Sequence, residues 1–335
     1  MLRILHDTKI DFIKRWRLVG AISAAFLVPA LVMIIVSMFT VGFDKAFKLG
    51  IEFTGGAVVQ VAFKQDVDIA TVRQTVTALY PSAEVQNFGS PRELVIRAQG
   101  REAGQVESAE AVSDEIRAAL HTSFGATAFS VVRWEGIGPR VGAELRRNAI
   151  IAMLISFAVT LLYLAWRFDA RLAIAAVAAN VHDIIATFAF IKYMQIEITL
   201  FVVGGILTVI GYSLADKVVV FDRVRELLRK GLRMALTDTL NLAINETLPR
   251  TVMTGSTVIA CLISLIMLGG EVLRPFALVL LFGIVVGTFS SIYVASPFLL
   301  FIEHKWPRHD GETKGMSRAL AEERKKDEKA GMAPR

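Results

Sequence analysis

The sequence predicts a polytopic α-helical membrane protein with six transmembrane helices and one external, ferredoxin-like α+β domain. Three observations support this prediction. Of the 335 residues, 54% are hydrophobic, whereas a soluble domain usually has about 45–50% apolar residues. The apolar residues gather in six blocks of about 17 to 26 residues, the length that crosses about 30 Å of hydrocarbon. The stretch of roughly 100 residues between the first two blocks has mixed polarity and can make one small domain.

Each block predicts one span. The first block contains Pro29 and no charge, and it is too long for a cleavable signal peptide and lacks a small-residue cleavage site. The third and fourth blocks contain charged residues, and the sixth is long enough to tilt. The predicted spans are 18–39, 149–166, 172–191, 198–221, 252–268 and 276–301.

Basic residues predict the orientation of these spans. Lys and Arg gather before the first span, after the second and fourth spans, and in the tail. The loops after the third and fifth spans hold only Lys192 and Arg274. Since Lys and Arg accumulate on the cytoplasmic side, we expect the N-terminus 1–17, the link 222–249 and the tail 302–335 to be cytoplasmic. The net charge of +6 therefore follows from topology and does not indicate a nucleic-acid partner.

The two inner segments differ in pattern. The link has leucines at helical spacing opposite basic residues, which predicts amphipathic helices lying on the membrane surface and contacting its lipid. The tail is charged without an apolar period, which predicts disorder. The single Cys261 excludes an internal disulfide framework.

The external segment 40–148 has the pattern of a small folded domain. Asp68 is a candidate N-cap, and Val112, Ile116 and Leu120 share one helix face. The order βαββαβ predicts a ferredoxin-like split βαβ unit. Its predicted elements are strand 57–63, helix 69–80, strands 84–88 and 93–97, helix 106–124 and strand 127–134. The segment contains no Ser–His–Asp spacing, metal cluster or Gly-rich phosphate loop, so we expect it to bind or move something. Arg140, Arg146 and Arg147 lie on the wrong side for the charge rule, from which long loops are largely exempt.

Charged residues inside the spans are the candidate functional residues. A charge at the bilayer centre costs about 2.5–3.5 kcal/mol on insertion scales, so such residues indicate function by default. Asp216 falls in the inner half of span four, and Arg250 lies two residues before span five. If these spans are neighbours, the long Arg250 side chain can reach Asp216. A membrane carboxylate beside a cationic partner has the outline of a proton relay, although Arg250 also fits a simple positive-inside flank.

Other ionisable groups leave alternatives open. Lys217 adjoins Asp216 but points about 100° away on a helix; it is one further candidate partner. Arg223 lies seven residues from Asp216 on the same face, and Asp222 precedes it where the helix leaves the membrane. Either can be an ordinary helix-end residue.

His182 and Asp183 lie in the middle of span three. Such a pair can relay protons or make a satisfied polar contact between helices. No second His or Cys accompanies it at ligand spacing, so we expect no metal. An intramembrane aspartyl protease needs two membrane carboxylates, here Asp183 and Asp216, but the Gly-x-Gly-Asp pattern is absent before Asp216.

Several motifs together resemble the SecD/SecF family of protein-export membrane subunits, which is related to the resistance–nodulation–division superfamily. The likeness covers nearly the whole chain apart from the tails. The motifs are GIEFTGG at 50–56, GPRVGAEL at 138–145, HD at 182–183, LTVIGYSLADKVVVFDR at 207–223, TLPRT at 247–251 and PFALVLLFGIVVGTFSSIYVASP at 275–297.

The resemblance implies an inner-membrane, non-enzymatic subunit that uses the proton-motive force, without a cofactor, to promote preprotein translocation and release at the periplasmic side. It implies SecD, the SecYEG channel and the exported unfolded polypeptide as partners, with YajC and YidC as further candidates. The family's proton-passage Asp and Arg fall on Asp216 and Arg250. The chain departs from the family at Ala215 and Lys217, where Asn and Thr are usual, and at Pro249, where Ser is usual.

Two other functions fit the sequence. One is half of a proton-driven exporter of small molecules, since such relatives typically carry twelve spans and two external domains. The other is a non-conducting scaffold of the export complex. Replacing Asp216 by Asn separates both proton-coupled functions from the scaffold.

Overall fold

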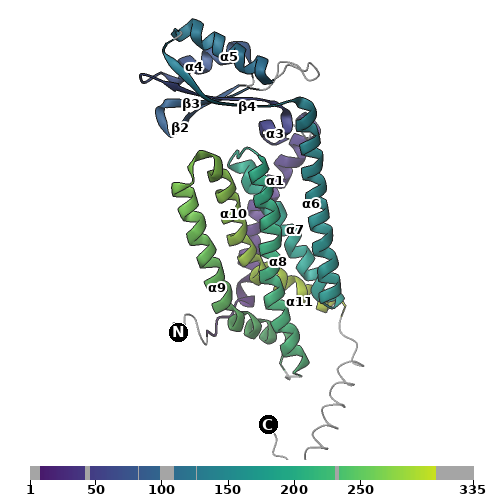
Figure 1. Cartoon of the computed structure of the whole chain (residues 1–335). Coiled ribbons are helices and arrows are strands. Elements are labelled where there is room, and N and C mark those ends of the chain that lie inside the picture. The colour runs from purple at the N-terminus through teal and green to yellow at the C-terminus, as the bar shows by residue number, and fades with distance from the viewer. Residues whose placement is uncertain are drawn as a thin grey trace, which may run out of the picture.

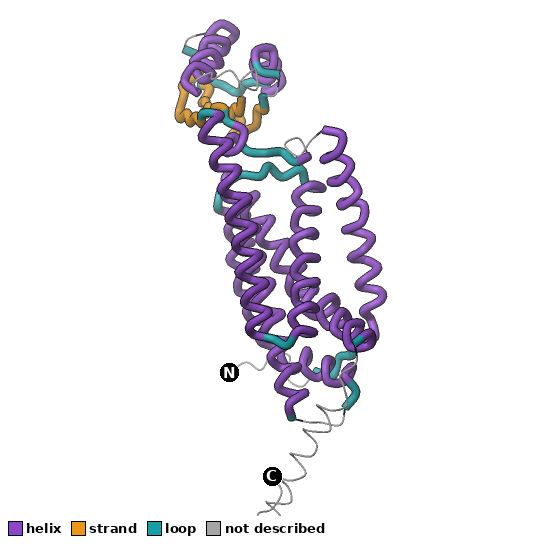
Figure 2. Tube along the Cα trace, turned by 90° about the vertical axis from the view of Figure 1, so that its right-hand side faces the viewer, coloured by secondary structure: helices purple, strands orange, loops and turns teal. Residues whose placement is uncertain are grey.

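The structure is a computed structural model that describes residues 8–41, 46–81, 83–98, 109–125, 127–230 and 234–306. Long helices form one bundle, and a small sheet with two helices lies beyond one end of it (Figures 1 and 2). The described chain begins and ends at the opposite end of the bundle (Figure 1). The predicted fold class, a six-span helical protein with one α+β domain, is confirmed. The predicted tail lies mostly outside the described residues.

Six helical stretches among the described residues are long and apolar enough to cross a membrane. Their main helices are α1 Trp16–Val41, α6 Pro139–Arg167, α7 Ala170–Tyr193, α8 Leu200–Arg229, α9 Leu236–Leu268 and α10 Gly270–Ser290. A 3-10 turn, Ile13–Arg15, precedes α1. A π-helical turn, Ser291–Ala295, joins α10 to α11, Ser296–Lys305.

Burial divides these spans into two classes. Half of the apolar window is buried in α7, in α8 and in the span that begins with α10, against 6% in α1, 11% in α6 and 17% in α9. The first group packs together as the interior of the bundle. The second group presents apolar faces outward, which suits contact with lipid or a partner subunit.

Three boundaries differ from the sequence prediction. α6 begins at Pro139 rather than near residue 149, because hydropathy marks where lipid begins and Pro at the first helical position marks where the helix begins. The link 222–249 is mostly the end of α8 and the first turns of α9, which cross the base of the bundle before the chain rises beyond Pro249 (Figure 1). The sixth span is interrupted at Ser291–Ala295 by the π-helical turn.

The external domain has a four-stranded antiparallel sheet of order β2-β3-β1-β4, the order of a ferredoxin-like unit. Its elements are a short helix α3 Ile51–Thr54, then β1 Gly56–Phe63, α4 Ile69–Leu79, β2 Glu84–Phe88, β3 Ser90–Ala98, α5 Ala109–Phe124 and β4 Phe129–Ile137. Both α4 and α5 lie on the face of the sheet that points away from the bundle (Figure 1). The first three residues of the predicted helix 106–124 lie outside the described residues.

Periodicity explains how the domain closes. Alternate residues of β1 point inward, and Val59 and Val61 are fully buried against the helices. Val112, Ile116 and Leu120, expected on one face of α5, are all buried in this core. Asp68 caps α4 as expected, because its carboxylate accepts hydrogen bonds from the N–H groups of Ala70 and Thr71. These bonds stabilise the charged form and lower the pKa of Asp68.

The external domain is attached to the bundle through the loop between α7 and α8. The N–H of Ile198 donates to the carbonyl of Lys48, and the N–H of Gly50 donates to the carbonyl of Ile198, each at 2.8 Å. Arg97 of β3 forms an ion pair of 3.5 Å with Glu197 in the same loop. The α7–α8 loop therefore bonds both to the segment after α1 and to the sheet.

A second attachment involves backbone contact. A Cβ placed on Gly142 of α6 would lie 2.9 Å from the backbone nitrogen of Gly55, a distance that side chains do not tolerate. Only glycine at position 142 permits this approach, so α6 rests directly on the turn that ends α3. The GIEFTGG motif is thus the joint between sheet and bundle.

Candidate functional site

The candidate site lies where α7, α8 and α10 pack together in the interior of the bundle. Close approach of α8 and α10 depends on a glycine, because a Cβ on Gly287 would lie 2.9 Å from Cβ of Ser213. Small residues allow membrane helices to approach this closely. The approach brings polar side chains of α7, α8 and α10 into one layer.

Asp183 of α7 is the centre of this layer. Nζ of Lys217 lies 2.5 Å from Oδ2 of Asp183, and both side chains are buried, with exposures of 0% and 1%. Oγ of Ser290 on α10 donates to the same oxygen at 2.6 Å. Ser213, one helical turn before Lys217, also bonds to Asp183. A buried ion pair persists only with such additional hydrogen bonds, because desolvating two charges is costly.

A second branch leaves Asp183 toward α1. Nδ1 of His182 lies 2.9 Å from Oδ1 of Asp183, and Nε2 lies 2.6 Å from Oγ of Ser23. With a neutral ring protonated at Nδ1, His182 donates to Asp183 and accepts from Ser23. The polar layer therefore extends across four helices, from α1 through α7 and α8 to α10.

Asp216 lies beside this layer but has different partners. Oγ1 of Thr288 on α10 donates to its Oδ2 at 2.9 Å, and the residue is 7% exposed. Lys217 points away from it to Asp183, as the 100° spacing of adjacent helical residues requires. The buried lysine therefore hydrogen-bonds to the other carboxylate, whereas it acts on Asp216 through its charge.

Arg250 acts on Asp216 at a distance. The expected neighbours α8 and α9 do pack together, and Arg250 contributes an electrostatic interaction with Asp216. The described residues show no ion pair within 4 Å between the two. Arg250 is exposed and lines a polar cleft of about 1030 Å³ at the base of the bundle. The sequence predicted a direct contact between Asp216 and Arg250. In the structure the two charges interact across a longer distance.

Asp222 and Arg223 lie outside the buried layer. Asp222 forms an ion pair of 2.6 Å with Arg167 at the end of α6. Arg223 pairs with Glu246 of α9 at 2.5 Å and with Glu226 one turn along α8. Arg223 therefore does not pair with Asp216, although both lie on one face of α8. Both residues also line the polar cleft.

Sequence reasoning missed the small polar partners. Ser213, Ser290 and Thr288 lie in apolar blocks, where hydroxyl groups give little signal because they commonly bond to their own helix backbone. Asn180 was missed as well. It lies one turn before Asp183 on α7 and is fully buried, and neither polar atom of its amide has a partner among the described residues. Its spacing of three residues from Asp183 was the available signal.

The arrangement can hold and transfer protons between oxygen and nitrogen atoms at hydrogen-bond distance. No group of three or more His, Cys, Asp or Glu among the described residues can hold a metal ion. Among the described residues Asp183 and Asp216 have different hydrogen-bond donors, whereas the paired carboxylates of an aspartyl protease share one proton.

Comparison with known proteins gives a consistent result. Two family profiles match: "Protein export membrane protein SecD/SecF, C-terminal" over residues 117–305, and "SecD/SecF GG Motif" over residues 37–67. Two relatives, each called protein translocase subunit SecF, come from Gemmatimonas aurantiaca and Magnetococcus marinus. The first is 47% identical over 92% of this chain and 92% of its own length. The second is 40% identical over 89% and 94%.

A solved structure is also similar. It is the crystal structure of SecDF, a translocon-associated membrane protein from Thermus thermophilus, with 30% identity and a TM-score of 0.75. The likeness covers 91% of this chain and 40% of that chain. The present chain thus spans about two fifths of the solved protein.

Proposed function

The chain belongs to the SecD/SecF family of protein-export membrane proteins, and from this premise we propose that it couples proton movement through its helices to motion of its external domain. It is a multi-pass protein of the bacterial inner membrane and an accessory subunit of Sec protein export. Its fit to two fifths of SecDF supports SecD as the partner that supplies the rest. No covalent chemistry is needed for this task.

The observation that supports the proposal is the contrast between Asp216 and the fixed pair beside it. Asp183 is held by a buried lysine and two serines, whereas Asp216 has one hydroxyl donor and two cations, Lys217 and Arg250, that act on it through charge without a hydrogen bond. A carboxylate with few stabilising donors can gain and lose a proton with little rearrangement of its surroundings. We therefore assign the exchanging proton to Asp216.

We assign the exit of the proton to a cleft that Val219 and Asp222 of α8 line, beyond Asp216 on the same helix. The polar cleft of about 1030 Å³ at the base of the bundle contains Arg250 and opens beside the lower part of α8. Protonation of Asp216 removes its attraction for Arg250 and leaves that side chain free to turn farther into the cleft that it lines. Deprotonation restores the attraction. With the charge-based orientation, protons enter from the periplasm and leave through this cleft toward the cytoplasm.

α8 is suited to carry the change to the external domain. It holds Asp216 in its middle, and the loop before it bonds to Lys48, Gly50 and Arg97. A shift of α8 relative to α10 pulls on that loop, and the loop is bonded to the sheet. The external domain then tilts against an emerging polypeptide on the periplasmic side.

The test is proton flux in sealed vesicles that contain this chain and SecD. Asp216→Asn keeps the size and the acceptor for Thr288 but cannot ionise, so we expect proton flux and potential-dependent preprotein export to fall at least tenfold. Asp238→Asn, an exposed carboxylate in the first turn of α9, is the matched control and should change neither. Export that stays at the wild-type level in Asp216→Asn would identify a scaffold instead.

The exporter of small molecules is tested in the same strains. The relatives are translocase subunits, which supports protein export as the task. Drug sensitivity and preprotein secretion, measured in the same depleted strain, distinguish small-molecule export from protein export. A depleted strain that becomes drug-sensitive while secreting normally would contradict protein export.

A further inference from the structure

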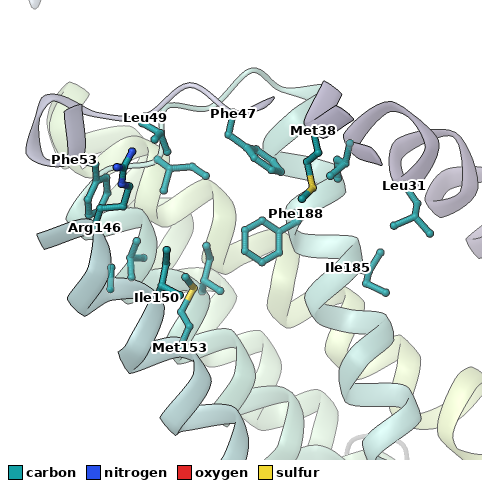
Figure 3. Close-up of a pocket in the computed structure, with 15 residues that line it drawn as sticks. Leu31, Met38, Phe47, Leu49, Phe53, Arg146, Ile150, Met153, Ile185 and Phe188 are labelled. Atoms are coloured by element: carbon teal, nitrogen blue, oxygen red, sulfur yellow. The ribbon is translucent and has the colours of Figure 1, made fainter. Parts of the chain in front are cut away.

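A pocket of about 280 Å³ lies near the external end of the bundle, and the proton path does not use it. Its walls come from α1, α6, α7, α8 and the GIEFTGG joint. Figure 3 shows Leu31 and Met38 of α1 on one side, Ile150 and Met153 of α6 on the other, and Phe188 of α7 between them. This volume is close to the lower limit of ordinary ligand pockets.

The lining identifies the chemistry of the occupant. Fourteen of the fifteen lining residues are apolar, and the exception is Arg146. Water needs two to four polar partners in a cavity, and these walls do not supply them. A pocket of this kind at membrane depth accepts a hydrocarbon chain. Dispersion contacts with the aromatic and aliphatic side chains favour such an occupant.

The pocket faces the bilayer between two helices. α1 and α6 each pack on α7, but over the described residues they are not among the closely packed helix pairs. Leu31 and Ile150, at the two sides of this gap, are 40% and 38% exposed. A lipid chain can therefore enter sideways from the membrane without unfolding either helix.

A positive charge at the rim of the pocket favours anionic lipids over neutral ones. Arg146 lies in the second turn of α6, at the end of the pocket nearest the external domain, beside Phe53 (Figure 3). Arg147 and Arg140 lie on the same end of α6, on the side where the charge rule predicts few basic residues. A guanidinium can bind the oxygens of a lipid phosphate with paired hydrogen bonds.

We propose that this pocket binds one acyl chain of an anionic phospholipid from the external leaflet, with the lipid phosphate at Arg146. The bound chain fills the gap between α1 and α6 beside Phe53 of the joint. This inference is independent of the proton path, since binding requires neither Asp216 nor a membrane potential.

The test is native mass spectrometry of the full chain, delipidated in detergent and titrated with phosphatidylglycerol or phosphatidylcholine of identical acyl chains. For the wild type we expect one tightly bound phosphatidylglycerol, with at least tenfold preference over phosphatidylcholine. Arg146→Gln should lose this preference. Arg147→Gln is the control, because it removes the same charge from the exposed neighbouring residue, and it should keep the preference.

Two pocket-filling variants complete the test. Ala149→Trp on α6 and Ile185→Trp on α7 each occupy the cavity, so the high-affinity lipid should be lost in every variant that keeps the wild-type unfolding temperature. Unchanged binding in a folded filled variant, or unchanged preference in Arg146→Gln, would overturn the proposal. Loss of SecD co-purification in a filled variant with unchanged lipid binding would also overturn it, because the pocket would then seat the partner subunit.

Discussion

Asp183 lies at the centre of the buried polar layer and Asp216 lies beside that layer, and their surroundings assign them different tasks. Asp183 is 1% exposed and accepts bonds from Lys217, Ser213 and Ser290, with His182 on its other oxygen. Asp216 has Thr288 alone as a side-chain donor among the described residues. The comparison teaches that burial alone does not mark an exchanging acid. The number and the charge of its donors decide whether its proton can move at low cost.

The largest loss of stability is expected when the counter-charge of Asp183 is removed. Lys217→Met leaves a buried carboxylate unpaired and should lower the free energy of unfolding by about 3–5 kcal/mol. The double variant Asp183→Asn/Lys217→Met removes both charges and should recover most of that loss. Denaturant unfolding of the purified chain measures both values.

Lys230→Met is the matched control for that prediction. Lys230 pairs with Glu226 at the exposed end of α8, where an ion pair contributes at most about 1 kcal/mol. A double variant as unstable as Lys217→Met would contradict a mutually dependent pair.

A second substitution tests the hydrogen bond that Thr288 donates to Asp216. Thr288→Val keeps the side-chain shape and removes the hydroxyl donor, so we expect a loss of about 1.5–3 kcal/mol if the partner is an ionised carboxylate. A neutral, protonated Asp216 predicts only about 0.5–1.5 kcal/mol. Thr160→Val is the control, since the hydroxyl of Thr160 donates to the backbone carbonyl of Ser156 in its own helix. An equal effect of both substitutions would show that Thr288 gives Asp216 no specific support.

Replacing Asn180 tests whether its buried amide takes part in the polar network around Asp183. The amide is buried without a hydrogen-bond partner among the described residues, and leaving a polar group in this state costs about 1–3 kcal/mol. Asn180→Leu should therefore raise the free energy of unfolding by about 1 kcal/mol. We expect the lower end of the range because leucine also adds volume to a packed interior. A loss of stability would instead show that the amide belongs to the polar network.

The smallest effect concerns an acid outside the membrane. Burial raises the pKa of Glu197, although Arg97 opposes the shift. The folded protein therefore binds this proton more tightly than the unfolded chain, so stability should fall as pH rises above the ordinary glutamate value of 4.5. Glu197→Gln should flatten that slope in thermal unfolding measured against pH. The exposed Glu110→Gln should leave the slope as in the wild type.

The sequence by itself determined the spans, the external domain and the identity of the costly residues. A stretch of about 20 apolar residues is long enough to cross the hydrocarbon as a helix, so residues 18–39 and the five later blocks are recognised by their length. Alternation in residues 57–63 and helical spacing at Val112, Ile116 and Leu120 predict a sheet covered by helices. Asp183, Asp216 and Lys217 stand out because charges are rare in such blocks.

Which charges meet depends on how the helices pack, and the sequence pattern does not show it. Neighbours in sequence diverge by about 100° on a helix, so Lys217 turns from Asp216 to Asp183, which lies 34 residues away. The partner that each side chain reaches depends on how closely α7, α8 and α10 pack, and that approach depends on Gly287 facing Ser213. Hydroxyl partners such as Thr288 and Ser290 become visible only in this packing, because an apolar block tolerates them wherever they face.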